Sequence, residues 1–152
     1  MRVRIEVIAC VGFSIAAAVI ARGASQVSTA VNIVDLNPQA LTDANFAITP
    51  DQPFMKSADK TPISAGGVNQ FTSADRLLTA GVSKFKKVTL NLSNWPVDEA
   101  MFILEGQVEI TDSAGHSRIY KAGDAFVMPK GFSGVWRQLT DIKKIQVVYA
   151  TK

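Results

Sequence analysis

The chain has 152 residues, which suits a single domain because domains commonly run to roughly 100–200 residues. Hydrophobic residues make up 47% and charged residues 19%, the balance of an ordinary globular protein with one core. The formal net charge is +3, but without the first 24 residues the chain keeps 13 basic (16 − 3) and 12 acidic (13 − 1) residues. This near-neutral remainder excludes an extended basic surface for nucleic acid.

The first residues have the organisation of a secretory signal peptide. Arg2 and Arg4 give a basic start, an apolar run of about fifteen residues follows over 7–21, and small residues come next. The run is shorter than the ~20 residues that a spanning helix needs, so we expect cleavage rather than a membrane anchor. We expect residues 1–24 to be removed, with the cut between 21 and 25. The mature protein would then be periplasmic or secreted, without a stable membrane span.

The next segment, residues 25–65, is expected to be an extended arm or an edge-strand region. It is polar and contains four prolines, which sheets tolerate at their edges because proline donates no backbone hydrogen bond. Only residues 31–34 and 46–48 within it resemble short strands.

After Gly66 and Gly67 the sequence changes to short β-type runs, and we expect a barrel over residues 66–152. Residues 112–115 separate two alternating runs and predict a hairpin turn. Regular short strands without helical periodicity predict an antiparallel sandwich or barrel. The predicted strands cover residues 77–82, 87–92, 99–104, 107–111, 116–120, 125–128, 134–139 and 144–150.

Two spaced motifs give this region a family resemblance. Glu99 and Gly106 are separated by six residues, and five residues separate Gly123 from the Pro129-x-Gly131 pattern. These spacings resemble the two motifs of the cupin superfamily, in which each motif occurs once and in this order. The resemblance implies an all-β fold, the cupin-type antiparallel β-barrel (double-stranded β-helix or jelly roll). The glycines suit tight corners with positive φ.

The residues of the motifs are similar to those of one cupin subfamily, which includes ureidoglycine aminohydrolase and the Q proteins of ethanolamine utilisation. The shared elements are Asp98-Glu99, Leu104-Glu105-Gly106, residues 122–126 and residues 129–136. The resemblance extends over roughly residues 71–149. It is specific for the fold and less specific for the reaction, because one fold hosts many functions.

The residues that bind metal in other cupins are replaced in this chain. Metal-binding cupins place a His-x-His pair before the glutamate and a third histidine after Pro-x-Gly, a ligand set suited to iron, manganese or zinc. The third position is Gly134, and the only histidine, His116, is expected to be an exposed loop residue. The first pair falls on Ser93 and Trp95, or on Leu92 and Asn94. We therefore expect no conventional metal site and no cofactor.

The resemblance points Glu99 into the barrel, where it is the candidate catalytic group. Strand alternation then places Met101 and Ile103 on the same face as Glu99. Trp136 lies two residues after Gly134, so its side chain would likewise face the pocket. Burial among apolar groups would disfavour the charged carboxylate and suit Glu99 to general acid–base work. Alternatively, Glu99 is a structural carboxylate that accepts hydrogen bonds from Lys87, Tyr149 or backbone amides, and the tryptophans are core residues. The candidate ligand-binding residues are Trp95, Glu99, Met101, Trp136 and Gln138.

Three functions are consistent with this sequence. The first is an exported cupin that binds a small polar or amine-bearing metabolite against Glu99 without a metal. The second, implied by the subfamily, is an enzyme similar to ureidoglycine aminohydrolase that releases ammonia by hydrolysis, although the metal ligands of that family are missing here. The third is a structural barrel whose arm, residues 25–65, exchanges with a second copy. We expect a homodimer in any of these cases.

Overall fold

The structure is a computed structural model, and it describes residues 32–42 and 45–150. The predicted signal peptide, residues 1–24, lies outside the described residues. Within the described part the chain forms eleven β-strands and a single turn of 3₁₀ helix, η1 (Pro38–Ala40). This confirms the predicted all-β fold. In the same part, no helix is long and apolar enough to cross a membrane.

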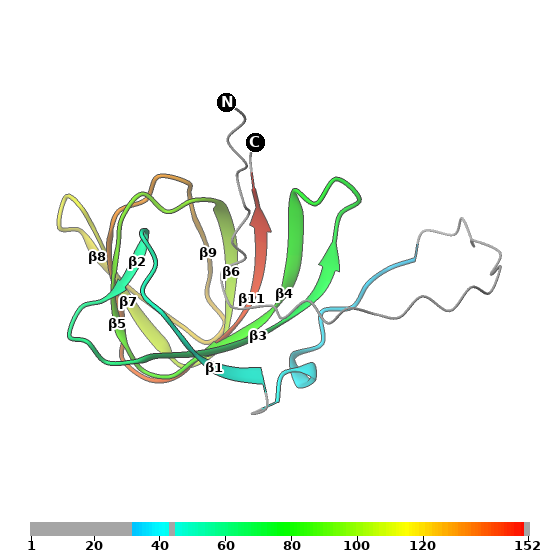
Figure 1. Cartoon of the computed structure of the whole chain (residues 1–152), viewed down its shortest axis with the longest axis horizontal. Coiled ribbons are helices and arrows are strands. Elements are labelled where there is room, and N and C mark those ends of the chain that lie inside the picture. The colour runs from blue at the N-terminus through cyan, green and yellow to red at the C-terminus, as the bar shows by residue number, and fades with distance from the viewer. Residues whose placement is uncertain (1–31, 43–44, 151–152) are drawn as a thin grey trace.

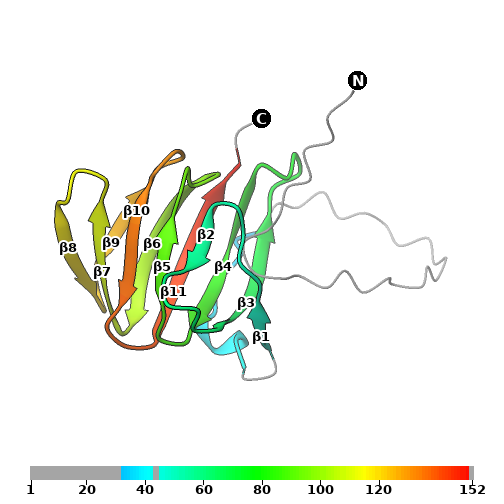
Figure 2. The ribbon, with the colours of Figure 1, turned by 60° about the vertical axis from the view of Figure 1, so that its left-hand side comes forward.

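The strands form two antiparallel sheets that curve around a shared interior (Figures 1 and 2). The six-stranded sheet has the order β1 (Phe46–Thr49), β3 (Ile63–Thr72), β4 (Leu78–Phe85), β11 (Ile142–Tyr149), β6 (Asp98–Glu105) and β9 (Ala125–Met128). The five-stranded sheet has the order β2 (Met55–Ser57), β5 (Thr89–Leu92), β10 (Gly134–Gln138), β7 (Gln107–Asp112) and β8 (Ser117–Lys121). Two facing sheets of this kind make a jelly-roll barrel.

The eight strands predicted after residue 76 correspond to β4–β11, with boundaries that differ by at most three residues. The hairpin predicted at residues 112–115 joins β7 to β8, where the Gly115 amide donates to the Asp112 carbonyl over 3.0 Å. The strand predicted at 46–48 is β1. The strand predicted at 31–34 is wrong for its described residues, because 32–34 have no strand structure.

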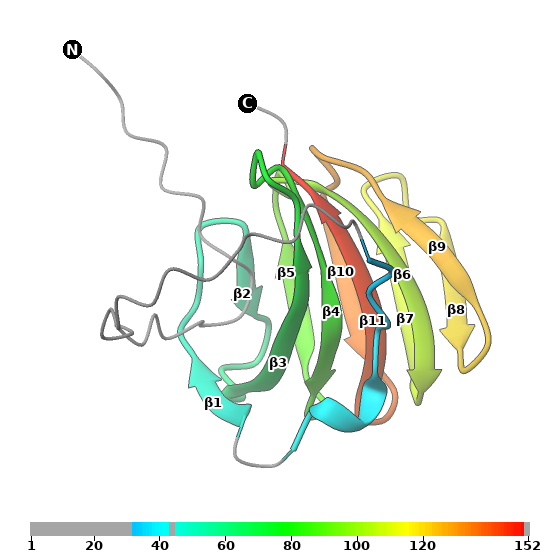
Figure 3. The ribbon, with the colours of Figure 1, turned by 90° about the vertical axis from the view of Figure 1, so that its right-hand side faces the viewer.

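Residues of the expected arm contribute to both sheets. As its prolines indicated, the segment supplies edge strands: β1 lies at one edge of the six-stranded sheet and β2 at one edge of the other (Figure 3). The pattern did not reveal β2, which has only three residues, or the first residues of β3, which are small and rich in glycine. Close packing explains that composition, since a Cβ at Gly66 would approach the Asn45 carbonyl oxygen within 2.8 Å.

The barrel interior is filled by alternate residues of each strand. In β6, Glu99, Met101 and Ile103 are buried, whereas Ala100 and Phe102 point outward and are exposed. The apolar core comprises Met55, Ile63, Val88, Leu90, Leu92, Trp95, Met101, Ile103, Val108, Met128, Trp136 and Ile142. The inward face of β6 therefore carries a carboxylate into a mainly apolar interior.

The motif glycines occupy corners with positive φ, as predicted. Their φ values are 89° at Gly106, 93° at Gly123 and 88° at Gly131. Gly106 connects β6 to β7 and also packs against the chain between β10 and β11, where an added Cβ would collide with the Asp141 carbonyl oxygen. Gly115 has a similar φ of 88°, but a Cβ there would meet open space.

This contrast predicts different costs for two alanine substitutions. Gly115→Ala should lower the free energy of unfolding by about 1–2 kcal/mol, the cost of placing a side chain in the left-handed region. Gly106→Ala should cost more, because the backbone must also move away from Asp141. Urea denaturation of both variants measures the difference. Equal losses would contradict the role assigned to the packing at Gly106.

Candidate ligand-binding site

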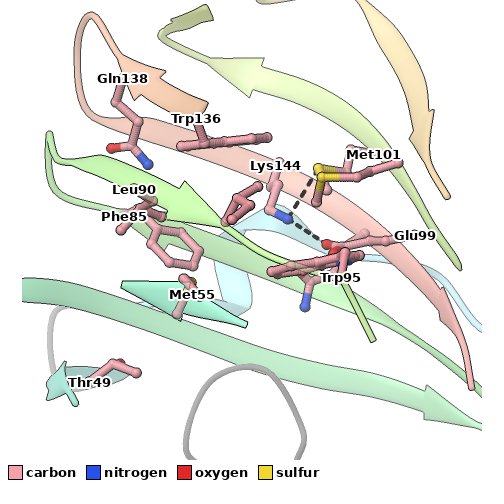
Figure 4. A pocket seen from close by; sticks show the side chains of 13 residues that line it. Thr49, Met55, Phe85, Leu90, Trp95, Glu99, Met101, Trp136, Gln138 and Lys144 are labelled. Atoms are coloured by element: carbon pink, nitrogen blue, oxygen red, sulfur yellow. Dashed lines mark hydrogen bonds and ion pairs between the residues drawn. The ribbon is translucent and has the colours of Figure 1, made fainter. Parts of the chain in front are cut away.

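A cavity lies in the barrel interior between the two sheets (Figure 4). Its volume is about 40 Å³, whereas a single water needs roughly 10–15 Å³. The cavity can therefore hold a few waters or a small organic molecule. Its walls are formed by Thr49, Met55, Phe85, Leu90, Leu92, Trp95, Glu99, Met101, Met128, Trp136, Gln138, Lys144 and Gln146.

A buried ion pair between Glu99 and Lys144 is the main polar feature of this cavity. The Lys144 ammonium (Nζ) lies 2.5 Å from Glu99 Oε1. Glu99 is 2% exposed and Lys144 is 5% exposed. Ions withdrawn from water lose several kcal/mol of hydration each, so the two charges depend on each other inside the barrel.

Soft and aromatic groups complete the surroundings of the Lys144 ammonium. Its Nζ lies 3.3 Å from Met101 Sδ and 5.8 Å from the centre of the Trp136 ring (Figure 4). The sulfur is a weak acceptor, and the face of an indole ring attracts a cation. Both contacts favour the cation without adding a second charge.

The register of β11 against β6 brings Lys144 into the barrel. A bulge shifts the pairing between Lys143 and Lys144, so Lys143 lies opposite Glu105 whereas Lys144 lies opposite Ile103. Residues opposite each other share a face of the sheet, and Ile103 points inward. The lysine side chain then reaches along β6, past Met101, to Glu99.

Two buried polar atoms at the cavity have no hydrogen-bond partner among the described residues: Glu99 Oε2 and Trp95 Nε1. The other tryptophan has a partner, because Trp136 Nε1 donates to the Gln138 side-chain oxygen over 3.1 Å. In this orientation of its amide, Gln138 also donates to the Lys86 carbonyl over 2.8 Å. A buried polar group without a partner costs about 1–3 kcal/mol. A hydrogen bond to water or to a ligand would therefore stabilise each of the two unpaired atoms.

The structure brings all five predicted binding residues to this cavity: Trp95, Glu99, Met101, Trp136 and Gln138. The sequence analysis did not identify Lys144 as a residue of the site. The expected hydrogen-bond donors to Glu99, Lys87 and Tyr149, are replaced by Lys144. The alternation of Ile142 and Lys144, both buried, was the available signal.

The residues present do not fit the metal site of other cupins. Lys144 places an ammonium against the only carboxylate of the cavity wall, where a metal ion would be repelled. At the former histidine position, an added Cβ on Gly134 would collide with the Thr111 carbonyl oxygen. His116 is exposed in the β7–β8 hairpin, with Nδ1 3.1 Å from Asp112 Oδ2. Among the described residues, no group of three potential ligating side chains could hold a metal ion.

Comparisons with known proteins show similarity to one family over part of the chain. Residues 87–145 match the sequence model of the EutQ-like cupin domain, whereas none of the curated proteins matches the chain. A protein of unknown function from the DUF861 family of Pseudomonas syringae pv. tomato is structurally similar, with a TM-score of 0.61 and 22% identity. The similarity covers 74% of this chain but only 46% of that protein, so the present chain spans about half of its length.

A second similar structure comes from Salmonella typhimurium and is described as a putative ethanolamine utilisation protein Q. Its TM-score is 0.51 and its identity 20%, over 70% of this chain and 95% of that one. At these identities the two structures support the fold alone.

Because the two buried charges depend on each other, removing one should be costly. Lys144→Met should lower the free energy of unfolding by about 3–5 kcal/mol, since it leaves Glu99 buried and unpaired. The double variant Glu99→Gln/Lys144→Met should lose less than the sum of the single variants, by roughly 1 kcal/mol or more. Urea denaturation measures all three.

The exposed pair Lys86–Asp141 (3.0 Å) provides the matched control. Lys86→Met should cost no more than about 1 kcal/mol, because water solvates both partners of a surface pair. Additive losses at Glu99 and Lys144 would show that the two charges do not interact in the folded protein.

Proposed function

We propose that the barrel of this protein, whose residues 87–145 match the EutQ-like cupin domain, binds a small polar metabolite without a metal ion. One observation carries the proposal: Glu99 Oε2 and Trp95 Nε1 are an acceptor and a donor left unpaired by the described residues at the same cavity. A molecule that both donates and accepts hydrogen bonds offers a partner for each of these buried atoms once a side-chain shift brings them to the cavity.

The charges of the cavity favour a neutral ligand. Glu99 and Lys144 cancel each other, and among the described residues of the wall they alone are ionisable. A charged ligand would meet one like and one opposite charge, so it would lose its hydration in the cavity without a net attraction in return. We had expected a polar or amine-bearing ligand, and the position of Lys144 favours the polar one. Amides, ureas and alcohols are the neutral groups that both donate and accept.

Apolar walls would hold the rest of such a ligand. Leu90, Leu92, Met128 and the two tryptophans present hydrocarbon and aromatic surface around the polar groups. Ligand sites in proteins commonly combine mainly apolar walls with a few placed polar groups. The alternative of ammonia-releasing hydrolysis in the manner of ureidoglycine aminohydrolase gains no such support, because the metal ligands associated with that activity are replaced.

Two further expectations remain proposals. Action in the periplasm or outside the cell depends on residues 1–24, which have the composition of a signal peptide. Homodimer formation depends on the general behaviour of cupins and on the arm at residues 25–65. Neither is needed for binding in the cavity.

The two tryptophans of the chain make binding directly observable. A ¹⁵N-labelled protein should show two indole N–H signals, which Trp95→Phe and Trp136→Phe assign. Acetamide, a small neutral probe, should shift the Trp95 signal in a saturable way and leave the Trp136 signal nearly unchanged, because only Trp95 Nε1 lacks a protein partner among the described residues.

Ethylammonium and acetate, which resemble acetamide in size and carry opposite charges, are the matched controls. Each should bind at least about tenfold more weakly than acetamide, because it would lose its hydration without a net attraction to the Glu99–Lys144 pair. If ethylammonium bound more tightly than acetamide, the proposal of a neutral ligand would be wrong.

A further inference from the structure

Lys144 has a feature that simple binding does not use, namely a primary amine held inside a cavity. Its side chain is 7% exposed, and it lines the same cavity as Trp136 and Met101. Lysines that act as nucleophiles toward carbonyl compounds are often held in pockets removed from water.

Glu99 is placed to handle the proton that such a reaction requires. Its Oε1 lies 2.5 Å from Lys144 Nζ, within reach for direct proton transfer. Its Oε2 has no partner among the described residues, and a molecule in the cavity would reach this buried atom after a small side-chain shift. One carboxyl group can thus take a proton from the amine and present a proton to a bound oxygen atom.

We propose that Lys144 condenses with a small neutral aldehyde or ketone to form a Schiff base, with Glu99 as the general acid–base. The proposal rests on the function proposed above, because the carbonyl compound must first enter the same cavity as a neutral polar ligand. The room of about 40 Å³ limits the compound to a few carbon atoms.

The reaction balances without any further reactant. The Lys144 ammonium gives a proton to Glu99, and the neutral amine attacks the carbonyl carbon, so that a C–N bond forms and the C=O π bond breaks. A proton passes from nitrogen to oxygen and gives a neutral carbinolamine. Glu99 then protonates the hydroxyl group, which leaves as water. The product is a protonated imine on Lys144 that faces the Glu99 carboxylate, so the charges at the end equal those at the start.

The surroundings of Lys144 suit this product. The positive charge stays on Nζ, where the Glu99 oxygen at 2.5 Å and the Trp136 ring at 5.8 Å already favour a cation. Lys86 differs in the property that matters: it is also paired with a carboxylate, at 3.0 Å from Asp141, but its side chain is 57% exposed. Lys86 therefore serves as the internal control for burial.

The test uses acetaldehyde with sodium cyanoborohydride, which reduces an imine to a stable ethylated lysine. Peptide mass spectrometry of a chymotryptic digest measures the rate of ethylation at each lysine. Lys144 should react faster than Lys86 by on the order of tenfold or more, and saturating acetamide should slow Lys144 but not Lys86. Lys144→Arg keeps the charge but has no primary amine, so this variant should lose the fast phase.

The outcomes separate the two proposals. If Lys144 reacts no faster than Lys86 while acetamide still shifts the Trp95 indole signal, the Schiff-base inference is overturned and the binding function stands. If acetamide neither shifts Trp95 nor protects Lys144, and Lys144 shows no fast ethylation, both proposals are overturned. Fast ethylation of Lys144 that acetamide suppresses supports both.

Discussion

The ion pair between Glu99 and Lys144 is the interaction on which the chemistry of this barrel depends. Two charges face each other at 2.5 Å in an interior that is otherwise mainly apolar. Such a pair does not by itself indicate a stable fold, because the loss of hydration can exceed the attraction between the charges. The pair also places a carboxylate and an amine in a cavity that a small molecule can enter.

Lys144 also gives the site a different character from that of a metal-binding cupin. In the metal-binding members, a glutamate and histidines surround a divalent cation. Here the inward glutamate meets an ammonium from β11, and glycine (Gly134) stands at the expected position of the third histidine. The cation is thus supplied by the chain itself. It carries one charge, it has donors rather than open coordination positions, and it can become a nucleophile by losing a proton.

The sequence predicted much of the fold and part of the site, for physical reasons that differ between residues. The corners at Gly106 and Gly123 were predictable because positive φ favours glycine, and the inward face of β6 was predictable because strand residues alternate. Lys144 was not predicted, because the strand was expected to begin at residue 144 and the alternation of Lys144 with buried Ile142 was overlooked. Its place opposite Ile103 also depends on a bulge in β6, which leaves Leu104 without a partner in β11 and which no local pattern shows. The pairing of Glu99 was therefore missed together with Lys144.

Elemental analysis of the purified protein, prepared without chelators or a histidine tag, tests most directly whether Lys144 takes the place of a metal. The arrangement around Glu99 predicts that no transition metal copurifies in near-stoichiometric amount with the wild-type protein. A near-stoichiometric metal that is lost in Glu99→Gln would contradict this, because Glu99 would then ligate an ion where the structure pairs it with Lys144.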